Sequence, residues 1–508
     1  MNDTFCTLII LDGFGESNKK QGNAIKLQGT PYIDSIKKAY PSTTLGASGE
    51  DVGIIKGQMG DSEVGHMNIG AGRVVTQNLL RINNAIKDNS FFENENILKI
   101  YQKVKQNNSS LHIMGLLSDG GVHSHYKHLF AYMKLAKQFK LKNVYLHVIS
   151  DGRDTGTHTG VGYIDILNKE IQKLGVGKVA TLSGRLYAMD REKNYDRTKQ
   201  YYDAIVNGKG IFKNSVNEAI QDSYNNGISD EFVLPYVILD EGKAHTIQDG
   251  DGLILFNYRK DRPRQILNSF LNEDFNNFET KKFNDLTILT TTVIDKTYNC
   301  LVGYQDLTLD ECLSQIISES GYKQLKVAET TKYAHVTYYL NGTVEPPFEN
   351  EDRKLFDSDK IKNFAEKPLM QAGKIADYVC EQAKLNKYKL IVVNIANGDM
   401  VGHTGDMEAA KITVKEIDRV VEQMVKTIVE CGGVAMITAD HGNVDEMINS
   451  KGEVSTNHSL NRVPFILVSD KYKDVKLKQG GKLCDIAPTI LKILNIKKPA
   501  KMTGDELF

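Results

Sequence analysis

Short apolar runs alternate along the chain with longer segments of helical periodicity. The runs at residues 7–11, 390–395 and 434–438 contain very few polar residues, which is typical of strands buried on both faces of a parallel sheet. The segments at about 311–320, 371–385 and 407–431 have the length and periodicity of amphipathic helices. This alternation predicts an α/β fold in which helices pack against a parallel sheet.

A second set of apolar runs lies in the middle of the chain, at residues 111–117, 144–149, 179–182 and 253–256. Segments of helical length separate these runs, and each run ends in a cluster of polar residues. Open α/β sheets bind ligands at the carboxyl ends of their strands. The middle of the chain is therefore expected to form an α/β domain of its own, with a site at its strand ends.

Three apolar runs outside this middle region end in an aspartate, namely Asp12, Asp399 and Asp440. The histidines close to these positions or to a later apolar run are His403, His441 and His458. Strand ends of a parallel sheet share one edge, and carboxylates and imidazoles that converge there are ligands for divalent transition metals. Each residue alone could be a helix cap or a satisfied core group. The joint pattern favours a metal centre, and with Ser62 it is large enough for two ions.

Ser62 lies in the glycine-rich stretch 57–66, just before a predicted helix. Free backbone N–H groups and the helix dipole favour a phosphate at such a position. By itself the residue is more typical of an ordinary loop serine. Beside a metal centre, however, its hydroxyl is a candidate nucleophile for phosphoryl transfer.

Five arginines follow the predicted strands of the middle region: Arg153, Arg185, Arg191, Arg259 and Arg262. Guanidinium groups bind carboxylate and phosphate oxygens in bidentate geometry, so the group predicts an anion pocket, although each alone could form a surface salt bridge. His123 and Asp154 could add acid–base chemistry. His123 could also be a hydrogen-bonded loop residue, and the His-x-His spacing to His125 raises a metal site as a less favoured alternative.

Asp12 and Ser62 precede the arginine-rich region, whereas the other candidate metal ligands follow it. If all of them meet at one centre, residues 77–307 are an insertion into a discontinuous domain formed by residues 1–76 and 308–508. The two chain crossings would then form a hinge between a metal domain and an anion-binding domain.

Composition narrows the possible partners. The chain of 508 residues has 63 Lys and Arg against 64 Asp and Glu, which argues against a broad nucleic-acid or membrane surface. Six scattered cysteines without a CxxC pair indicate reduced packing residues. The N-terminus has no basic leader, and no apolar stretch has the length of a membrane span. We expect a cytoplasmic protein that acts on a small molecule, and a monomer, since no coiled-coil pattern demands a partner.

Several long motifs resemble the cofactor-independent (2,3-bisphosphoglycerate-independent) phosphoglycerate mutases of the alkaline phosphatase-like superfamily. They include LIILDGFG from Leu8, GQMGDSEVGHMNIGAGR from Gly57, SGRLYAMDR from Ser183 and TADHGN from Thr438. The resemblance covers essentially the whole chain. It implies a phosphatase-like metal domain interrupted by a transferase-like substrate domain, two manganese ions, and no need for 2,3-bisphosphoglycerate.

Residue roles follow from the same resemblance. Ser62 would become phosphoserine. One manganese site would consist of Asp399, His403 and His458, and the other of Asp12, Ser62, Asp440 and His441. The substrate pocket would comprise His123, Arg153, Asp154, Arg185, Arg191, Arg259, Arg262 and Lys332. The chain departs from the family at Asp61, where an asparagine is usual, and a carboxylate there could raise the pKa of the serine or draw the metal.

The resemblance implies interconversion of 3-phosphoglycerate and 2-phosphoglycerate, a step of glycolysis and gluconeogenesis. In this hypothesis Ser62 accepts the phosphoryl group, Lys332 stabilises its charge and Asp154 moves protons to and from the glycerate hydroxyls. One alternative is a metal-dependent phosphohydrolase with the same nucleophile. Another is a non-catalytic protein that binds metal or phosphate, which would tolerate Ser62→Ala.

Overall fold

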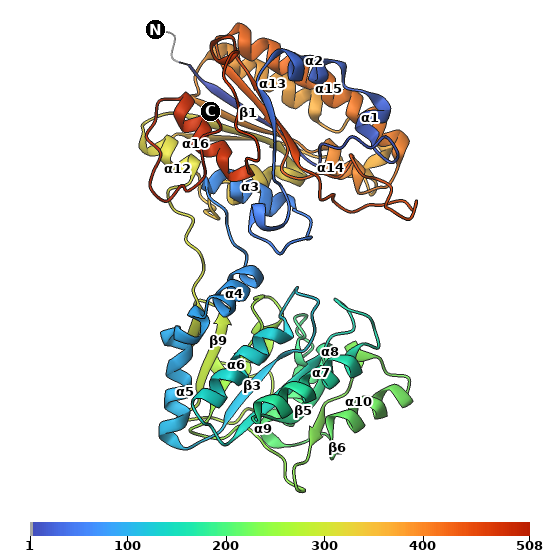
Figure 1. Ribbon diagram of the computed structural model, residues 1–508, viewed down its shortest axis with the longest axis vertical. Coiled ribbons are helices and arrows are strands. Elements are labelled where there is room, and N and C mark those ends of the chain that lie inside the picture. The colour runs from blue at the N-terminus through green and yellow to red at the C-terminus, as the bar shows by residue number, and fades with distance from the viewer. Residues whose placement is uncertain (1–3) are drawn as a thin grey trace. The chain divides into compact units, whose positions relative to one another are not determined.

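The computed structural model describes residues 4–508, and the chain divides into two compact units. One unit comprises the chain up to Gln77 together with Thr308–Phe508, and the other comprises Asn78–Leu307. Each unit is built on its own sheet with helices on both faces (Figure 1). The predicted α/β fold class is confirmed.

The sheet of the first unit has seven strands in the order β12-β11-β13-β1-β14-β15-β2. They are β1 (Cys6–Leu11), β2 (Ser42–Leu45), β11 (Gln324–Glu329), β12 (Glu351–Phe356), β13 (Leu390–Ile395), β14 (Val434–Thr438) and β15 (Val463–Val468). Only β15 runs against its neighbours in this sheet. The strands predicted at residues 7–11, 390–395 and 434–438 are parallel to one another, as expected, and β15 shows that a continuous apolar run does not reveal strand direction.

Helices cover both faces of this sheet. Figure 1 shows α1 (Ala24–Gln28), α2 (Pro31–Ala39), α13 (Ala372–Leu385) and α15 (Met407–Glu430) on one side, and α3 (Ser62–Ala71), α12 (Leu313–Glu319) and α16 (Ile486–Ile493) on the other. Shorter helical segments are η1 (Gly49–Val52), η4 (Thr330–Lys332), the π-helix η5 (His335–Tyr339), η6 (Phe364–Glu366), α14 (Asn397–Gly402), η7 (Asp470–Tyr472) and η8 (Leu483–Asp485). The four central strands are fully buried, which fixes the positions of their carboxyl ends.

The sheet of the second unit has eight strands in the order β10-β9-β8-β3-β4-β5-β7-β6. They are β3 (Leu111–Leu116), β4 (Val144–Ser150), β5 (Lys178–Gly184), β6 (Ile211–Lys213), β7 (Tyr236–Ile238), β8 (Gly252–Leu255), β9 (Thr287–Thr292) and β10 (Leu301–Tyr304). The strands from β10 to β5 are parallel, and β7 and β6 run in the opposite direction. The carboxyl ends of β3, β4, β5 and β8 thus share one edge of the sheet.

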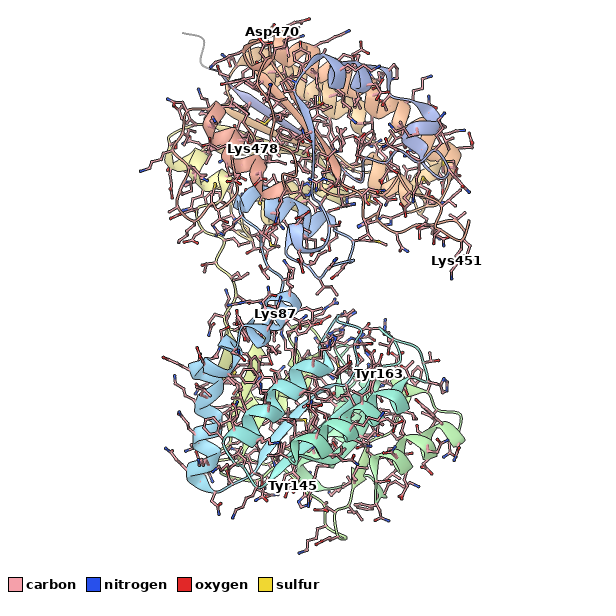
Figure 2. All side chains as sticks on the ribbon, in the orientation of Figure 1. Lys87, Tyr145, Tyr163, Lys451, Asp470 and Lys478 are labelled. Atoms are coloured by element: carbon pink, nitrogen blue, oxygen red, sulfur yellow. The ribbon has the colours of Figure 1, made fainter. Side chains whose placement is uncertain are left out.

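The second unit also has helices on both faces. The helical segments are α4 (Asn78–Lys87), η2 (Ser90–Glu93), α5 (Glu95–Asn107), α6 (Tyr126–Gln138), α7 (Gly160–Leu174), α8 (Arg185–Ala188), α9 (Tyr195–Asn207), α10 (Val216–Asn225), η3 (Asp230–Phe232) and α11 (Pro263–Leu271). Residues of α9 and α11 pack with alternate residues of β3 and β8 in one apolar cluster, whereas α5 packs against Gly252 on the opposite face. Figure 2 shows side chains filling the layers of each unit, with Tyr145 of β4 and Tyr163 of α7 labelled. Among residues 4–508, no helix combines the length and apolar character needed to cross a membrane.

Candidate active site

The strand order of the first unit brings three aspartates together. β1 lies between β13 and β14, and Asp12 follows β1 directly. Asp399 lies in α14, which begins two residues after β13 ends, and Asp440 lies two residues after β14. All three side chains are buried. Three carboxylates at one buried edge require compensating positive charge.

Ser62 reaches this edge because it is the first residue of α3. The carboxylate of Asp61 caps the helix by accepting a hydrogen bond from Val64 N at 2.7 Å. Ser62 Oγ lies 2.9 Å from His441 Nε2 and 3.2 Å from Asp12 Oδ1. The serine is 5% exposed, so its hydroxyl is held among charged groups with little access to bulk water.

Lys332 supplies positive charge from the 3₁₀ turn η4 that follows β11. Its Nζ donates hydrogen bonds to Ser62 Oγ at 2.6 Å, Asp12 Oδ1 at 2.7 Å and Asp399 Oδ2 at 2.7 Å. Burial opposes the charge, but the surrounding aspartates raise the pKa of Lys332, and the side chain stays protonated. One ammonium faces three carboxylates, which leaves an excess of negative charge.

Two imidazoles meet at Asp399. His403 Nδ1 lies 2.7 Å from the Thr456 carbonyl oxygen, and His458 Nδ1 lies 2.8 Å from the Gly60 carbonyl oxygen. Carbonyl oxygens only accept, so each Nδ1 carries the hydrogen and each neutral ring has its lone pair on Nε2. The two Nε2 atoms lie 3.0 Å apart, and each lies 3.1 Å from Asp399 Oδ1. Three electron-pair donors directed at one point fit a divalent transition metal.

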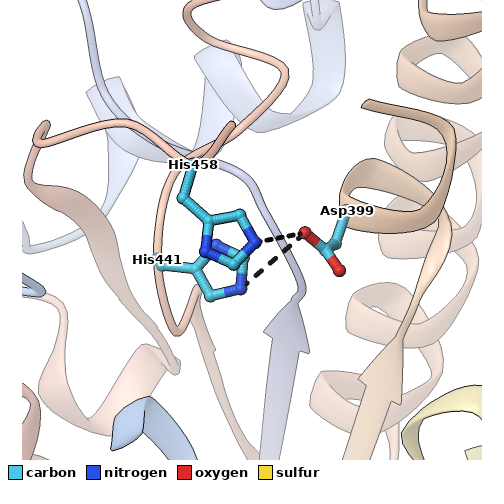
Figure 3. Close-up of side chains that lie close together, drawn as sticks. All are labelled: Asp399, His441 and His458. Atoms are coloured by element: carbon cyan, nitrogen blue, oxygen red, sulfur yellow. Dashed lines mark ion pairs between the residues drawn. The ribbon is translucent and has the colours of Figure 1, made fainter. Parts of the chain in front are cut away.

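His441 lies between the group formed by Asp399, His403 and His458 and the group formed by Asp12, Ser62 and Asp440, which we call the two halves of the cluster. Its ring stacks on His458 with centroids 3.8 Å apart, and both rings face Asp399 (Figure 3). His441 Nε2 lies 3.5 Å from Asp12 Oδ1 and 3.6 Å from Asp440 Oδ2. Asp440 Oδ2 is buried and accepts no hydrogen bond among the described residues, as expected for an oxygen that binds a cation.

Asp12 and Asp440 differ in the charged groups that surround their carboxylates. Burial and the neighbouring charge of Asp440 raise the pKa of Asp12. Burial acts in the same direction on Asp440, but His441, His66 and Lys332 outweigh it and hold the pKa of Asp440 well below its usual range. The donor set of oxygens and imidazole nitrogens, crowded and short of positive charge, fits divalent ions in both halves of the cluster.

The sequence interpretation did not include three further polar residues of this cluster. His66 lies 3.3 Å from Asp440 Oδ2, and Asn394 Nδ2 donates to Asp12 Oδ2 at 2.8 Å. Asn443 Nδ2 donates to Asp399 Oδ1 at 3.1 Å. Asn394 could have been found, because it is a polar residue inside an otherwise apolar strand.

The second unit gathers its own polar cluster at the ends of β3, β4, β5 and β8. Arg185 is buried at the end of β5 and donates from Nη1 to Asp151 Oδ1 at 2.6 Å and to Asp154 Oδ2 at 2.7 Å. Arg262 is 9% exposed, and its pKa is lowered by burial and by the neighbouring charges of Arg185 and Arg191. Close guanidinium groups repel one another unless an anion lies between them.

The other predicted arginines are more exposed and pair with carboxylates. Arg191 and Arg259 both contact Asp261, a residue that the sequence interpretation missed, and Arg153 contacts Glu231 at 3.5 Å. Such exposed pairs are weak and exchange readily for a bound anion. His123 and Asp154 belong to the same cluster.

His123 is buried between two carboxylates, 3.9 Å from Asp154 Oδ2 and 3.8 Å from Asp261 Oδ1. Burial and the nearby Arg185 nevertheless lower the pKa of His123 to about 4, so the ring is neutral at pH 7. His125 points elsewhere, since its Nδ1 accepts a hydrogen bond from Lys127 N at the start of α6. The less favoured His-x-His metal site gains no support from this divergence.

Comparison with known proteins extends the similarity over essentially the whole chain, as the motifs predicted. The family model described as BPG-independent PGAM N-terminus matches residues 82–296. A 2,3-bisphosphoglycerate-independent phosphoglycerate mutase of Clostridium botulinum is 47% identical over 504 residues, covering 99% of this chain and 98% of the relative. Its counterpart in Clostridium tetani is 47% identical over 511 residues, covering 100% and 99%. A crystal structure of Leishmania mexicana phosphoglycerate mutase at low cobalt concentration matches with 27% identity and a TM-score of 0.64, covering 100% of this chain and 98% of that one.

Proposed function

The chain belongs to the family of 2,3-bisphosphoglycerate-independent phosphoglycerate mutases, and we propose that it interconverts 3-phosphoglycerate and 2-phosphoglycerate through a phosphoserine at Ser62. The observation that carries this proposal is the position of Ser62 Oγ, 2.6 Å from Lys332 Nζ and 2.9 Å from His441 Nε2 at a buried, electron-rich strand edge. A hydroxyl in these surroundings is a nucleophile for phosphoryl transfer.

We propose two divalent ions, Mn²⁺ in the cell, in the two halves of the cluster. Asp399, His403 and His458 would hold one ion, and Asp12, Ser62, Asp440 and His441 would hold the other. When bound, these ions supply positive charge beside the nucleophile and the phosphoryl oxygens, and they lower the pKa of the serine hydroxyl.

The residues of the first unit carry out the transfer itself. Ser62 Oγ gives up its proton and forms a bond to phosphorus while the bond from phosphorus to the substrate oxygen breaks, and the leaving alkoxide takes up one proton in return. Lys332 donates to the serine oxygen and to two aspartates, which places its charge where the nucleophilic oxygen ionises. In the second half of the reaction, the other glycerate hydroxyl attacks phosphoserine and restores Ser62.

The second unit, which we propose as the inserted substrate domain, would bind the glycerate. Arg185 and Arg262 are its buried cations, and Arg153, Arg191 and Arg259 are exposed ones for the carboxylate and phosphate. Asp154 would move protons to and from the hydroxyls, and neutral His123 would contact the phosphate. A mutase must retain glycerate between the two transfers, whereas a phosphohydrolase need not hold its leaving alcohol. The arginine cluster therefore favours the mutase.

The substrates are small molecules, and we propose that the protein acts on them as a monomer in the cytoplasm. Its nearly balanced charge supports the absence of a nucleic-acid or membrane partner. Size-exclusion chromatography with light scattering would give the mass of a single 56.8 kDa chain if the monomer is correct, and twice that mass would contradict it.

The decisive experiment uses metal-stripped protein with Mn²⁺ restored and no 2,3-bisphosphoglycerate added. Production of 2-phosphoglycerate and of free phosphate is followed from 3-phosphoglycerate, for the wild type and for Ser62→Ala. We expect Mn²⁺-dependent 2-phosphoglycerate with little phosphate, and a loss of at least ~10³-fold in the variant. Free phosphate as the main product would establish the phosphohydrolase instead, and an active Ser62→Ala protein would remove Ser62 as nucleophile.

A further inference from the structure

A line of close polar contacts connects two of the metal-site carboxylates through two residues outside the ligand set, by hydrogen bonds from Asp12 to His66 and by an ion-pair contact from His66 to Asp440. Asn394 Nδ2 lies 2.8 Å from Asp12 Oδ2 and 3.1 Å from His66 Nε2. On its other side, His66 Nδ1 lies 2.8 Å from the Ser62 carbonyl oxygen and 3.3 Å from Asp440 Oδ2. All five residues are buried.

The partners determine where the hydrogens lie. Asn394 Nδ2 has two hydrogens and only donates, so one goes to the carboxylate of Asp12 and the other to His66 Nε2. His66 Nε2 therefore carries the lone pair, and the hydrogen is on Nδ1, where it bonds to the Ser62 carbonyl oxygen with Asp440 Oδ2 3.3 Å from the same nitrogen. In this tautomer His66 has no free lone pair for a metal, although one of its ring nitrogens lies within 4.8 Å of carboxylate oxygens of Asp12 and Asp440.

The elements that carry these groups make the link rigid. Asn394 is on β13, next to β1, and Asp12 follows β1 directly. His66 is on α3, one turn after Ser62, and it reaches Asp440 at the end of β14. The link thus spans three neighbouring strands and the helix that carries the nucleophile.

We propose that His66 and Asn394 are positioning residues that hold the carboxylates of Asp12 and Asp440 in place for one metal ion, and that His66 is not itself a ligand. This inference rests on the proposed metal centre. Asp12 and Asp440 present carboxylate oxygens within 4.8 Å of each other, so the two anions repel and would otherwise turn apart when no ion is bound. N–H groups behind the ligands fix their orientation, by a hydrogen bond at Asp12 and by a close contact at Asp440, and loss of such groups typically costs about 10–100-fold in metal affinity.

The other half of the cluster provides a contrast within the same protein. Asn443 Nδ2 donates to Asp399 Oδ1, whereas His66 and Asn394 contact neither Asp399 nor its histidines among the described hydrogen bonds. Each proposed ion therefore has its own asparagine, Asn394 for one and Asn443 for the other. Loss of either asparagine should affect one metal-binding step and spare the other.

The test is a calorimetric titration of metal-free protein with Mn²⁺, for the wild type, Asn394→Leu, His66→Leu and Asn443→Leu. We expect two binding steps in the wild type. Asn394→Leu and His66→Leu should weaken the same step about 10–100-fold and leave the other within threefold, and Asn443→Leu should weaken the other step. His66→Asn, which keeps an N–H near the position of Nδ1, should recover most of the lost affinity.

His112→Gln is the matched control, because His112 is also a fully buried histidine that contacts an aspartate, 3.2 Å from Asp251 Oδ2 in the second unit. It should lower the melting temperature without changing either metal step, which separates general destabilisation from positioning. The inference is overturned if folded His66→Leu and Asn394→Leu bind both ions as the wild type does.

The titration also distinguishes three further outcomes. Complete loss of a step in His66→Leu and His66→Asn, with Asn394→Leu unchanged, would make His66 a ligand and overturn its positioning role. A wild type that binds no Mn²⁺ would overturn the proposed metal centre itself, and the inference with it. Two intact steps in every variant would leave the centre standing and remove only the positioning role.

Discussion

Lys332 Nζ contacts the nucleophile and two of the carboxylates. Its charge belongs to a side chain that is not a proposed metal ligand, so substitution can remove this charge without removing a ligand. Replacement by methionine removes the ammonium but keeps much of the side-chain volume. We expect kcat/KM to fall about 10²–10³-fold, since a hydrogen-bonding cation beside the reacting oxygen is lost. Mn²⁺ affinity should stay equal or rise, because Asp12 and Asp399 lose a competing cation.

Steady-state kinetics and Mn²⁺ titration of Lys332→Met check both expectations. The matched control is Lys326→Met, in the strand that leads to η4, where a buried Nζ donates to Ser314 Oγ at 2.8 Å. That change should alter stability and leave kcat/KM within about threefold. Metal binding that weakens in Lys332→Met would mean that the lysine organises the site rather than stabilising charge in the reaction.

Asp61 places a carboxylate beside the nucleophile, where the sequence predicted an effect on the pKa of the serine or on the metal. The structure gives this carboxylate another role, as the N-cap of α3 through its bond from Val64 N. We expect Asp61→Asn to keep the cap and change the free energy of unfolding by less than ~0.5 kcal/mol, and Asp61→Ala to lower it by about 1 kcal/mol. Urea unfolding measures both, and equal losses in the two variants would show that charge rather than capping matters.

At the level of elements, the seven apolar runs from residues 7–11 to 434–438 match strands to within about two residues at each end, whereas the buried strand β9 was not predicted. Their apolar runs are continuous and their ends are marked by Asp-Gly, Ser-Gly or Asn-Tyr, so the position of Asp12 and Asp440 beyond β1 and β14 followed directly. The short strands β6 and β7 and the direction of β15 depend on tertiary pairing and left no periodic signal. The same holds for His66, which lies inside a helix and becomes part of the site only because α3 approaches Asp440, two residues beyond the end of β14.

The glycines of α3 allow that close packing. A Cβ on Gly65 would lie 2.7 Å from the carbonyl oxygen and 2.8 Å from the Cβ of Asp440. Gly65→Ala should therefore destabilise the protein by about 1–3 kcal/mol and reduce activity at least tenfold, although alanine is the better helix former. Gly162 of α7 has nothing within 4 Å, and Gly162→Ala should stabilise by about 0.5–1 kcal/mol.

Thermal unfolding and kcat/KM of the two glycine variants test whether α3 must approach the strand end this closely. If Gly65→Ala gained stability and kept its activity, the helix would have room to move away from Asp440. The position of Ser62 would then not depend on this contact.

On the scale of the whole molecule, the first unit is closed by pairing between distant parts of the chain. β1 lies between β13 and β14, and β2 pairs with β15, so its N-terminal strands find partners only after residue 390. This pairing brings the candidate ligands from both ends of the sequence to one edge of the sheet. The sequence could predict that they meet once the middle region was interpreted as an insertion. Sequence alone could not divide the arginines into buried and exposed ones, because burial arises only when the chain folds. Their contacts with Asp151, Asp261 and Glu231 also form only in the fold.

The second unit also makes the stability of the protein sensitive to acid. Four of its histidines are buried: His112, His123, His128 and His147. Burial lowers the pKa of each, to about 4 for His123 and to about 3 for His128. In the unfolded chain each titrates near ~6.5. Between these values the unfolded state binds protons that the folded state does not, so stability falls as the pH drops below about 6.5 and is unaffected by these groups above about pH 7.5.

For each fully buried histidine that stays neutral, the protein loses about 1.6 kcal/mol of stability between pH 6.5 and pH 5. We therefore expect hydrogen-exchange protection of amides in β3 to β5 to fall steeply from pH 7 to pH 5, after correction for the intrinsic pH dependence of exchange. His128→Gln should make this fall shallower, because it removes one of the four groups while keeping a donor for the hydrogen bond to Asn83 Oδ1. The ring protons of His128 should show no titration by NMR down to pH 5, and a midpoint near 6.5 would contradict the linkage, since the folded and unfolded states would then bind protons alike.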